Sequence, residues 1–458
     1  GEGVLEPGRD ARLERRQGGM RACGVPGHGA ILTMGRAGRG DYNRRFVSNV
    51  TDDRMSQIAE LLRPGQRIFV AGSVNEPGAV LAALRDATLP GNLRFIQFPI
   101  AGYNREDFTA YAPDARFTTF FMTPHLKDAD PARLDFLPMQ MRRVYDYVAN
   151  NVDVVLLQVA RGADGRLRLG PNVDFLGAAL DSAATVIAEQ NTAFTAPAGC
   201  PVIDEARIDA LIEAHRPLHE MAAPAPDPAA EAIGALVAGE VRDGDCIQTG
   251  IGGIPAAILA RLTDKNDLGL HGGLIDDGGM ALIENGNVTG ARKEIDRGVH
   301  VTGMALGSHA MMDWLAERPE VAFHGANYTH EVSVIGRLSG FVSVNSAVEV
   351  DLYGQVNAEM AGGRQISGTG GSVDFMRAAR ASAGGRSIIA MNATARGGSV
   401  SRIVPKVELV TALRTDVDLV VTEYGVARLR DAPLRSRAEA LIEIAAPAFR
   451  DELRAAIP

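Results

Sequence analysis

The chain has 458 residues, of which 46% are hydrophobic and 22% charged, and its formal net charge at pH 7 is −9. This length exceeds what one ordinary hydrophobic core supports, so we expect two or more globular domains. The acidic balance argues against a nucleic-acid or anionic-membrane partner, and no apolar run reaches the ~18–20 residues that span a bilayer. Three widely spaced cysteines, Cys23, Cys200 and Cys246, form no Cys-x-x-Cys pair and favour a reducing, cytoplasmic location.

The first part of the chain differs in composition from the rest. Residues 1–45 are rich in glycine and arginine and contain no apolar core segment, which argues against a secretory signal peptide. Acidic residues among the arginines argue against a mitochondrial transit peptide. We therefore expect residues 1–45 to be a disordered or poorly ordered leader.

From about residue 50 the hydrophobic pattern alternates between helix and strand. Helical spacing over 52–62 and 76–87 flanks a short apolar strand at 66–72. Residues 152–160, VDVVLLQVA, form a continuous apolar run that is typical of the middle of a parallel sheet covered on both faces. Residues 183–191 repeat this pattern.

Alternating alanine and proline over 218–230 predict a linker, because they disfavour both helix and strand ladder. Beyond it, helices are predicted at 229–241 and 254–262. Five further segments are predicted as strands or strand-rich: 245–252, 299–306, 333–350, 387–391 and 417–425. The sequence thus predicts two α/β domains with mostly parallel sheets, 46–220 and 221–458.

Three glycine-rich turns lie in the second domain, at 250–255, 367–375 and 395–400. A glycine turn that opens a helix can present its N–H groups to an anion or an oxyanion. A single turn of this kind is better explained as a tight strand-to-helix connection. Three in one domain favour a ligand that carries phosphate or an acyl group.

Several other chemistries find no support in the sequence. None of the glycine turns continues into a Walker motif, and Pro255 occupies the last position of a dinucleotide-binding pattern. There is no HExxH or Gly-x-Ser-x-Gly pattern, and no Cys/His cluster that predicts a metal. We expect His271, His324 and His330 to be structural.

The stretch NSAVEVDLYGQVNAEMAGGRQISGTGGSVDFMRAA, residues 345–379, resembles the signature of the acetyl-CoA hydrolase/transferase family, which includes 4-hydroxybutyrate CoA-transferases. Five other segments are similar to that family: 72–84, 153–175, 250–259, 395–405 and 420–453. The resemblance implies two tandem CoA-transferase-like α/β domains, with the acyl-CoA site in the cleft between them and carried by the C-terminal one. It also implies a homodimer whose small-molecule partners are acyl-CoA and carboxylates.

By this resemblance, backbone amides at Gly252 and Ile254, together with those of Gly370 and Gly371, line an oxyanion hole for the thioester. Such donors are worth ~3–4 kcal/mol in comparable acyl-transfer sites.

The same resemblance implies contacts to coenzyme A. Arg396 stands where family members usually carry lysine in "AKGG", and its guanidinium suits phosphate. Gly397 and Gly398 complete this turn. Asn357 and Glu423 lie in matching motifs, and we expect them to help hold the coenzyme.

The family's chemistry depends on a glutamate that attacks the thioester, in a pattern such as LGIHTEMFSDG. This chain reads LGLHGGLIDDG over 268–278, so the resemblance places Gly273 at the glutamate position. We expect Asp276 to be the catalytic carboxylate, acting on a water, and Asp277 to be structural. The glycines are also expected to leave space for a bulky acyl group or a water.

The sequence therefore predicts an enzyme that acts on acyl-CoA thioesters, either a CoA-transferase or an acyl-CoA hydrolase. Transfer by the usual glutamyl-CoA route is doubtful because glycine has no carboxylate. Two alternatives remain: hydrolytic C–C cleavage of a β-keto acyl-CoA, and non-catalytic binding of coenzyme A. A nucleotide-dependent oxidoreductase is more distant, since no dinucleotide fingerprint is present.

Overall fold

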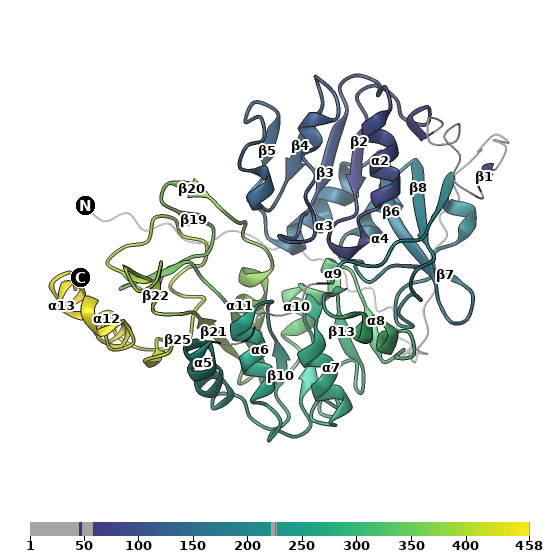
Figure 1. Cartoon of the computed structure of the whole chain (residues 1–458). Helices are drawn as coiled ribbons and strands as arrows, with labels where there is room; N and C mark the ends of the chain where they lie inside the picture. The colour runs from purple at the N-terminus through teal and green to yellow at the C-terminus, as the bar shows by residue number, and fades with distance from the viewer. Residues whose placement is uncertain (1–44, 48–57, 221–224, 226, 458) are drawn as a thin grey trace, which may run out of the picture. The chain divides into compact units, whose positions relative to one another are not determined.

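The fold is given by a computed structural model (Figure 1), which describes residues 45–47 (backbone alone), 58–220, 225 and 227–457. We call the described residues up to 220 the first half and those from 225 onward the second half. Each half contains one large sheet that is mostly parallel. The predicted leader lies outside the described residues except for Arg45, which begins strand β1.

The first half holds a nine-stranded sheet in the order β1-β9-β8-β6-β2-β3-β4-β5, with β7 paired to β6. Its strands are β1 (Arg45–Val47), β2 (Arg67–Val70), β3 (Arg94–Gln97), β4 (Arg116–Thr119), β5 (Leu134–Phe136), β6 (Val154–Arg161), β7 (Leu167–Leu169), β8 (Thr185–Asn191) and β9 (Ala210–Ala214). All neighbours are parallel except β6 and β7. In Figure 1, β5, β4, β3 and β2 lie side by side in that order.

Strand β6 explains the apolar run at 152–160. It lies between β2 and β8, and seven of its residues, 154–160, are buried. The α-helices of this half are α2 (Gly78–Asp86), α3 (Met141–Asn150) and α4 (Leu176–Ser182), and its short 3-10 helices are η1 (Ser73–Asn75), η2 (Phe108–Ala110), η3 (Pro124–Leu126) and η4 (Glu205–Arg207). Pro77 precedes α2, as the sequence predicts.

The second half holds a six-stranded sheet in the order β11-β10-β16-β21-β25-β26, in which only β25 and β26 are antiparallel. These strands are β10 (Cys246–Gln248), β11 (Gly269–Leu270), β16 (Phe341–Asn345), β21 (Arg386–Ala390), β25 (Leu419–Thr422) and β26 (Gly425–Arg428). The helices are α5 (Pro228–Ala238), α6 (Gly253–Ala260), α7 (Asp277–Glu284), α8 (His309–Leu315), α9 (Ala326–Thr329), α10 (Val332–Ile335), α11 (Ser372–Ala381), α12 (Leu434–Glu443), η5 (Pro447–Phe449) and α13 (Arg450–Ala455).

Short strand pairs complete the second half: β12 (Leu274–Ile275) with β14 (Met304–Ala305), β13 (His300–Thr302) with β15 (Val321–Phe323), β19 (Met360–Ala361) with β20 (Arg364–Gln365) and β22 (Thr394–Ala395) with β23 (Val400–Ser401). Strand β17 (Glu349–Asp351) pairs with both β18 (Val356–Asn357) and β24 (Ile403–Val404). Helix α11 packs on β16 and β21.

A hydrophobic core is shared between the two halves. One cluster of buried side chains includes Phe98 and Phe175 from the first half and Leu270 and Ile275 from the second. The expected α/β architecture with mostly parallel sheets is confirmed. The boundary near 220 stays a prediction, although the first sheet ends at β9 and the second half's first helix begins at Pro228.

One predicted segment is wrong in part. The apolar stretch 333–350 was expected to be strand-rich throughout, but Val332–Ile335 form helix α10, and only Phe341–Asn345 and Glu349–Asp351 are strands. The Glu331 side chain accepts a hydrogen bond from the Ser333 amide and starts the helix. Of the helix predicted at 52–62, residues 52–57 lie outside the described residues.

Candidate active site at the carboxyl edge of the second sheet

The predicted site segments follow neighbouring parallel strands. Strands β11, β10, β16, β21 and β25 are parallel, so their carboxyl ends share one edge. The turn at 250–252 follows β10, the loop at 271–273 follows β11, and Glu423 follows β25. Ligands of open α/β sheets bind at this edge.

The turn before α6 leaves backbone donors open. Gly252 has φ +120°, a conformation that favours glycine, and no side chain caps the helix that follows. A Cβ placed on Gly250 or Gly252 would meet no atom within 4 Å. The first N–H groups of α6, including that of Ile254, therefore lie in a turn with free space on one side.

The second glycine turn, 367–371, is held against the first half. Gly370 has φ +57°, and its carbonyl accepts a hydrogen bond of 3.1 Å from the Met141 amide. The Glu359 carboxylate accepts bonds from Gln365 at 3.1 Å and from Thr369 at 3.2 Å. Glu359 thus positions this turn, which is a structural role.

His330 lies between two glycine positions of the predicted site. A Cβ on Gly273 would lie 2.9 Å from His330 Cε1 and 3.0 Å from Nε2, and a Cβ on Gly371 would lie 2.4 Å from Nε2. The ring packs against Phe375 with centroids 4.4 Å apart, and Nδ1 lies 2.8 Å from Thr329 Oγ1. Burial lowers the pKa of His330 to about 3, so the imidazole is neutral at working pH.

The space expected at these two glycines is therefore filled by His330 at Gly273, whereas Gly272 lines a small cavity. The His330 ring fills the direction in which a side chain at position 273 would point, and Gln248 fills that direction for Gly272, with its Cγ at 3.2 Å. His330 was expected to be only structural, and no sequence pattern predicted its contact with Gly273. Contacts between distant segments carry no local sequence pattern.

The two neighbouring aspartates both bond to helix starts, but only Asp276 is a helix cap. Asp276 precedes α7 and accepts a 2.9 Å bond from the Gly279 amide, while burial raises its pKa. Asp277 accepts bonds from the Ser308 amide and hydroxyl, and so ties α7 to the start of α8. Asp277 therefore has the structural role that was predicted. Asp276 also lines a cavity with Gly272 and Gln248, and its catalytic role stays a prediction.

Arg396, Gly397 and Gly398 form the exposed turn between β22 and β23. All three have positive φ, of 50°, 66° and 92°. The turn therefore presents an arginine side chain at the surface, and a bulky or charged ligand can reach it.

Asn357 and Glu423 are engaged with the protein itself. The Asn357 amide donates to Glu349 and to the Met360 carbonyl, and its oxygen accepts from the Glu359 and Met360 amides. A coenzyme contact to Asn357 would have to replace one of these bonds. Glu423 accepts a 2.8 Å bond from the amide of Ala393, which directly precedes β22.

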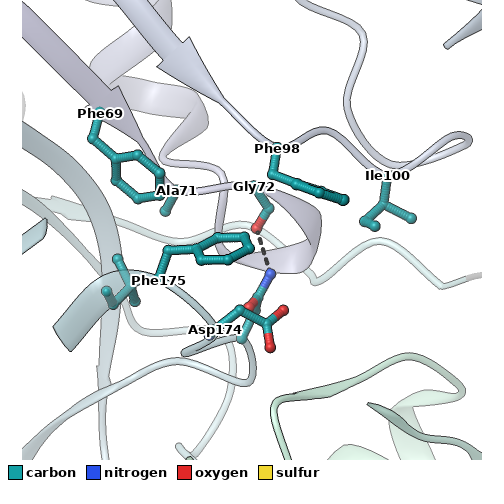
Figure 2. Close-up of a pocket in the computed structure, with 9 residues that line it drawn as sticks. Phe69, Ala71, Gly72, Phe98, Ile100, Asp174 and Phe175 are labelled. Atoms are coloured by element: carbon teal, nitrogen blue, oxygen red, sulfur yellow. Dashed lines mark hydrogen bonds between the residues drawn. The ribbon is translucent and has the colours of Figure 1, made fainter. Parts of the chain in front are cut away.

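A second cavity lies in the first half, and no residue of it was predicted as a site (Figure 2). Its lining residues are Phe69, Ala71, Gly72, Phe98, Ile100, Asn172, Asp174, Phe175 and Leu176. Asp174 is the one ionisable side chain in this lining. Its only sequence signal is a carboxylate in the otherwise apolar stretch around 173–180.

Neither cavity contributes a metal site, since the described residues contain no group of three or more His, Cys, Asp or Glu side chains that could hold a metal ion. Among the same described residues, no helix has the length and apolarity needed to cross a membrane.

Comparison with known proteins agrees with the predicted family. Residues 34–213 match the model of the acetyl-CoA hydrolase/transferase N-terminal domain, and residues 307–457 match that of the C-terminal domain. The chain is 42% identical over 398 residues to 4-hydroxybutyrate coenzyme A transferase of Clostridium kluyveri, covering 84% of this chain and 92% of that protein. It is 39% identical over 423 residues to succinyl-CoA:cyclohexane-1-carboxylate CoA transferase of Geobacter metallireducens, covering 90% and 95%.

Among solved structures, RipA from Yersinia pestis superposes with a TM-score of 0.81 at 30% identity, covering 91% of this chain and 97% of RipA. The two family models together span more than half of this chain. The matches to the two relatives and to RipA each extend over more than nine tenths of the matched protein's length. The chain belongs to the acetyl-CoA hydrolase/transferase family.

Proposed function

We propose that this protein binds acyl-CoA thioesters and releases coenzyme A from them, with water as the preferred acceptor. Family membership supports the substrate class, because the similar proteins include CoA transferases and an acetyl-CoA hydrolase by name. The choice between acceptors rests on the residues of this chain.

The glycine turns at Gly252 and Gly370 carry the proposal. Each opens a helix, α6 or α11, in whose first turn the N–H groups lack side-chain caps. Such donors polarise a thioester carbonyl and stabilise the oxyanion that forms on attack. Removal of one such donor lowers the rate by about a hundredfold to a thousandfold in comparable sites.

Water is favoured over a glutamyl-CoA intermediate because position 273 offers no nucleophile. Glycine cannot form an anhydride or a thioester, and the His330 ring occupies the adjacent volume. A carboxylate that activates water needs only to lie near the acyl carbon, and need not be bonded to it.

The coenzyme is proposed to bind with its phosphates near the turn 396–398. The exposed Arg396 guanidinium offers a fork of donors to phosphate oxygens. The two glycines that follow it allow close approach of a ligand, because neither carries a side chain.

We also infer that the protein works as a cytosolic homodimer. The odd number of cysteines supports a reducing compartment, and Cys200 and Cys246 are free and buried. Sedimentation velocity at micromolar concentration tests the assembly: a species of twice the chain mass is expected, and a monomer at all concentrations contradicts it.

An assay of thiol release from acyl-CoA, with and without acetate, tests the function. Free CoA without an acceptor is the expected result. CoA exchange that requires acetate would show a transferase instead. No reaction with short, branched and aryl acyl-CoAs contradicts the proposed enzyme and favours a protein that only binds coenzyme A.

A further inference from the structure

The cavity in the first half is built from aromatic rings around one carboxylic acid. In Figure 2 the rings of Phe69, Phe98 and Phe175 lie above the Asp174 carboxylate, and all four residues line the cavity. The cavity has room for about one water molecule. A hydrogen bond of 3.2 Å from Asn172 to the Gly72 carbonyl closes one side.

Asp174 is buried and one of its oxygens has no partner. Its residue is 2% exposed, and Oδ1 makes no hydrogen bond to any described residue. The backbone is fixed on both sides: its amide donates to Asn172 Oδ1 at 3.2 Å, and its carbonyl accepts from the Ala326 amide at 2.8 Å. An unpaired buried carboxyl costs stability, so a functional reason for it is expected.

Other strained or unpaired groups lie close in sequence and space to this cavity. Ser73, next to Gly72, has φ +57°, which is unfavourable for a residue with a side chain, and its buried hydroxyl has no partner among the described residues. The buried side-chain oxygen Oδ1 of Asn75 also has no partner among the described residues. The side-chain NH₂ group of Asn75 donates a hydrogen bond to the Asn172 carbonyl. Strain and unpaired polar groups concentrate at functional sites.

The carboxylate lies beside the loop that lacks the glutamate. The segment before Asp174 runs along β14, with a 2.9 Å bond from the Val173 amide to the Gly303 carbonyl. Strand β14 pairs on its other side with β12, which begins directly after Gly273. A Cβ on Gly303 would lie 2.0 Å from Asp174 Oδ1 and 3.1 Å from the Gly273 carbonyl oxygen, so both oxygens flank one point.

We propose that Asp174, in place of Asp276, which caps helix α7, is the catalytic base of this enzyme and supplies from the first half the carboxylate that Gly273 lacks. This inference rests on the proposed function. Asp174 Oδ1 takes a proton from a water in the cavity, and the water oxygen bonds to the acyl carbon. The C–S bond then breaks, and the CoA thiolate takes the proton from Asp174. The products are a carboxylic acid and the CoA thiol, and Asp174 is again a carboxylate.

The electrostatic surroundings agree with this role. Burial raises the pKa of Asp174 to about 8 and is the one cause of the shift, so no charged side chain among the described residues sets it. Tyr145 is the titratable side chain near the Asp174 backbone, since both lie close to Gly325. Burial raises the pKa of Tyr145 as well. A base with a pKa near working pH combines sufficient ionisation with sufficient proton affinity.

The test compares Asp174→Asn with a matched control, Glu76→Gln. Burial also raises the pKa of Glu76, to about 7, but its carboxylate accepts hydrogen bonds from the Gln97 and Asn104 side chains. Initial rates of thiol release from acetyl-CoA and butyryl-CoA are measured between pH 6 and 9.5. The affinity for a non-hydrolysable acyl-CoA thioether is measured by calorimetry.

The wild-type rate is expected to rise about tenfold per pH unit below pH 8 and then level off. Asp174→Asn is expected to lose about a hundredfold or more in rate and to keep its affinity for the thioether, while Glu76→Gln keeps the wild-type rate and pH profile. A folded Asp174→Asn protein with the wild-type rate overturns the role of Asp174 alone. A wild-type protein without thiol release overturns the proposed function, and this inference with it.

A second measurement needs no variant. Single turnover of the wild-type protein in ¹⁸O-water is expected to place the label in the carboxylic acid product and none in the protein. Label in the Asp174 side chain would show direct attack by the carboxylate and overturn its role as a base.

Discussion

At the scale of single residues, the pair Gly273 and His330 explains why this chain cannot use a glutamate at position 273. The imidazole stands within 3.0 Å of where a Cβ would be, and it also lies against Gly371. The ring is buried and packs against Phe375, so it cannot easily swing away. A side chain at position 273 would therefore clash with the His330 ring in its present position.

A double substitution tests this coupling. Gly273→Glu alone is expected to be inactive in transfer and destabilised by a few kcal/mol, because the new side chain meets the His330 ring. Gly273→Glu with His330→Ala removes the clash and is expected to gain acetate-dependent CoA exchange. The measurement is isotope exchange between acyl-CoA and acetate. His330→Ala alone is the control, and exchange by Gly273→Glu alone would contradict the steric argument.

The pKa of Asp174 makes a prediction about stability. Its folded pKa, about 8, lies above the ordinary aspartate value of 3.8, so ionisation opposes folding and wild-type stability declines as pH rises between those values. The asparagine of Asp174→Asn cannot ionise. The free energy of unfolding of this variant, relative to that of the wild type, should therefore increase as pH rises over this range. The gain is several kcal/mol at most, at about 1.4 kcal/mol per pKa unit. Urea unfolding at pH 5 and pH 9 measures it, and a difference independent of pH contradicts the burial argument.

At the scale of elements, helix starts and strand ends create the candidate site. The turns at 250–252 and 367–371 adopt positive φ at glycine and lead into helices α6 and α11. Their glycine-rich sequences predicted both turns, and helix α6 was predicted after the first of them, whereas helix α11 was not predicted. The sequence could not show that the second turn docks onto Met141 of the first half, because that contact joins distant segments.

Gly370→Ala tests the importance of this turn, and Gly384→Ala is a matched control. Both glycines have positive φ, +57° and +72°, so alanine costs about 1 kcal/mol or somewhat more at each. Only Gly370 lies in the proposed oxyanion turn. Both variants should lose similar thermal stability, while only Gly370→Ala should lose about tenfold or more in kcat. Equal kcat values for the two variants would contradict a catalytic role of the turn.

Arg396→Ala tests the proposed phosphate contact, with Arg435→Ala as a second exposed arginine on helix α12. Loss of a charge-assisted phosphate contact should raise KM for acyl-CoA about tenfold with little change in kcat, since the reacting atoms lie elsewhere. Steady-state kinetics at two salt concentrations measure this. An unchanged KM for Arg396→Ala would place the coenzyme phosphates away from this turn.

At the scale of the whole molecule, the two halves share one hydrophobic core, and the candidate groups come from both. The α/β architecture was predictable because helix and strand periods are local properties, as in the buried run of β6. Of the linker predicted at 218–230, residues 228–230 instead belong to helix α5, which begins at Pro228 after the Asp227 cap. Helix α10 was missed because its apolar residues resemble a strand when read without the Glu331 cap.

The candidate site could be predicted only in its local parts. The glycine turns and the structural role of Asp277 were predicted from local sequence, although the partner of Asp277, Ser308, was not. The contact of His330 with Gly273, and that of Asp174 with the segment beside Gly273, depend on how the halves pack together. Such contacts join residues far apart in the chain, and neither composition nor periodicity encodes them.

The central claim is that backbone amides at the two glycine turns polarise an acyl-CoA carbonyl. The most direct test uses an acyl-CoA analogue with a methylene between a ¹³C-labelled carbonyl and sulfur, bound to the wild-type protein. Isotope-edited infrared difference spectra should show the carbonyl stretch shifted to lower frequency on binding, with a smaller shift in Gly370→Ala. A bound analogue whose carbonyl absorbs at the frequency found in water, or higher, would contradict this account.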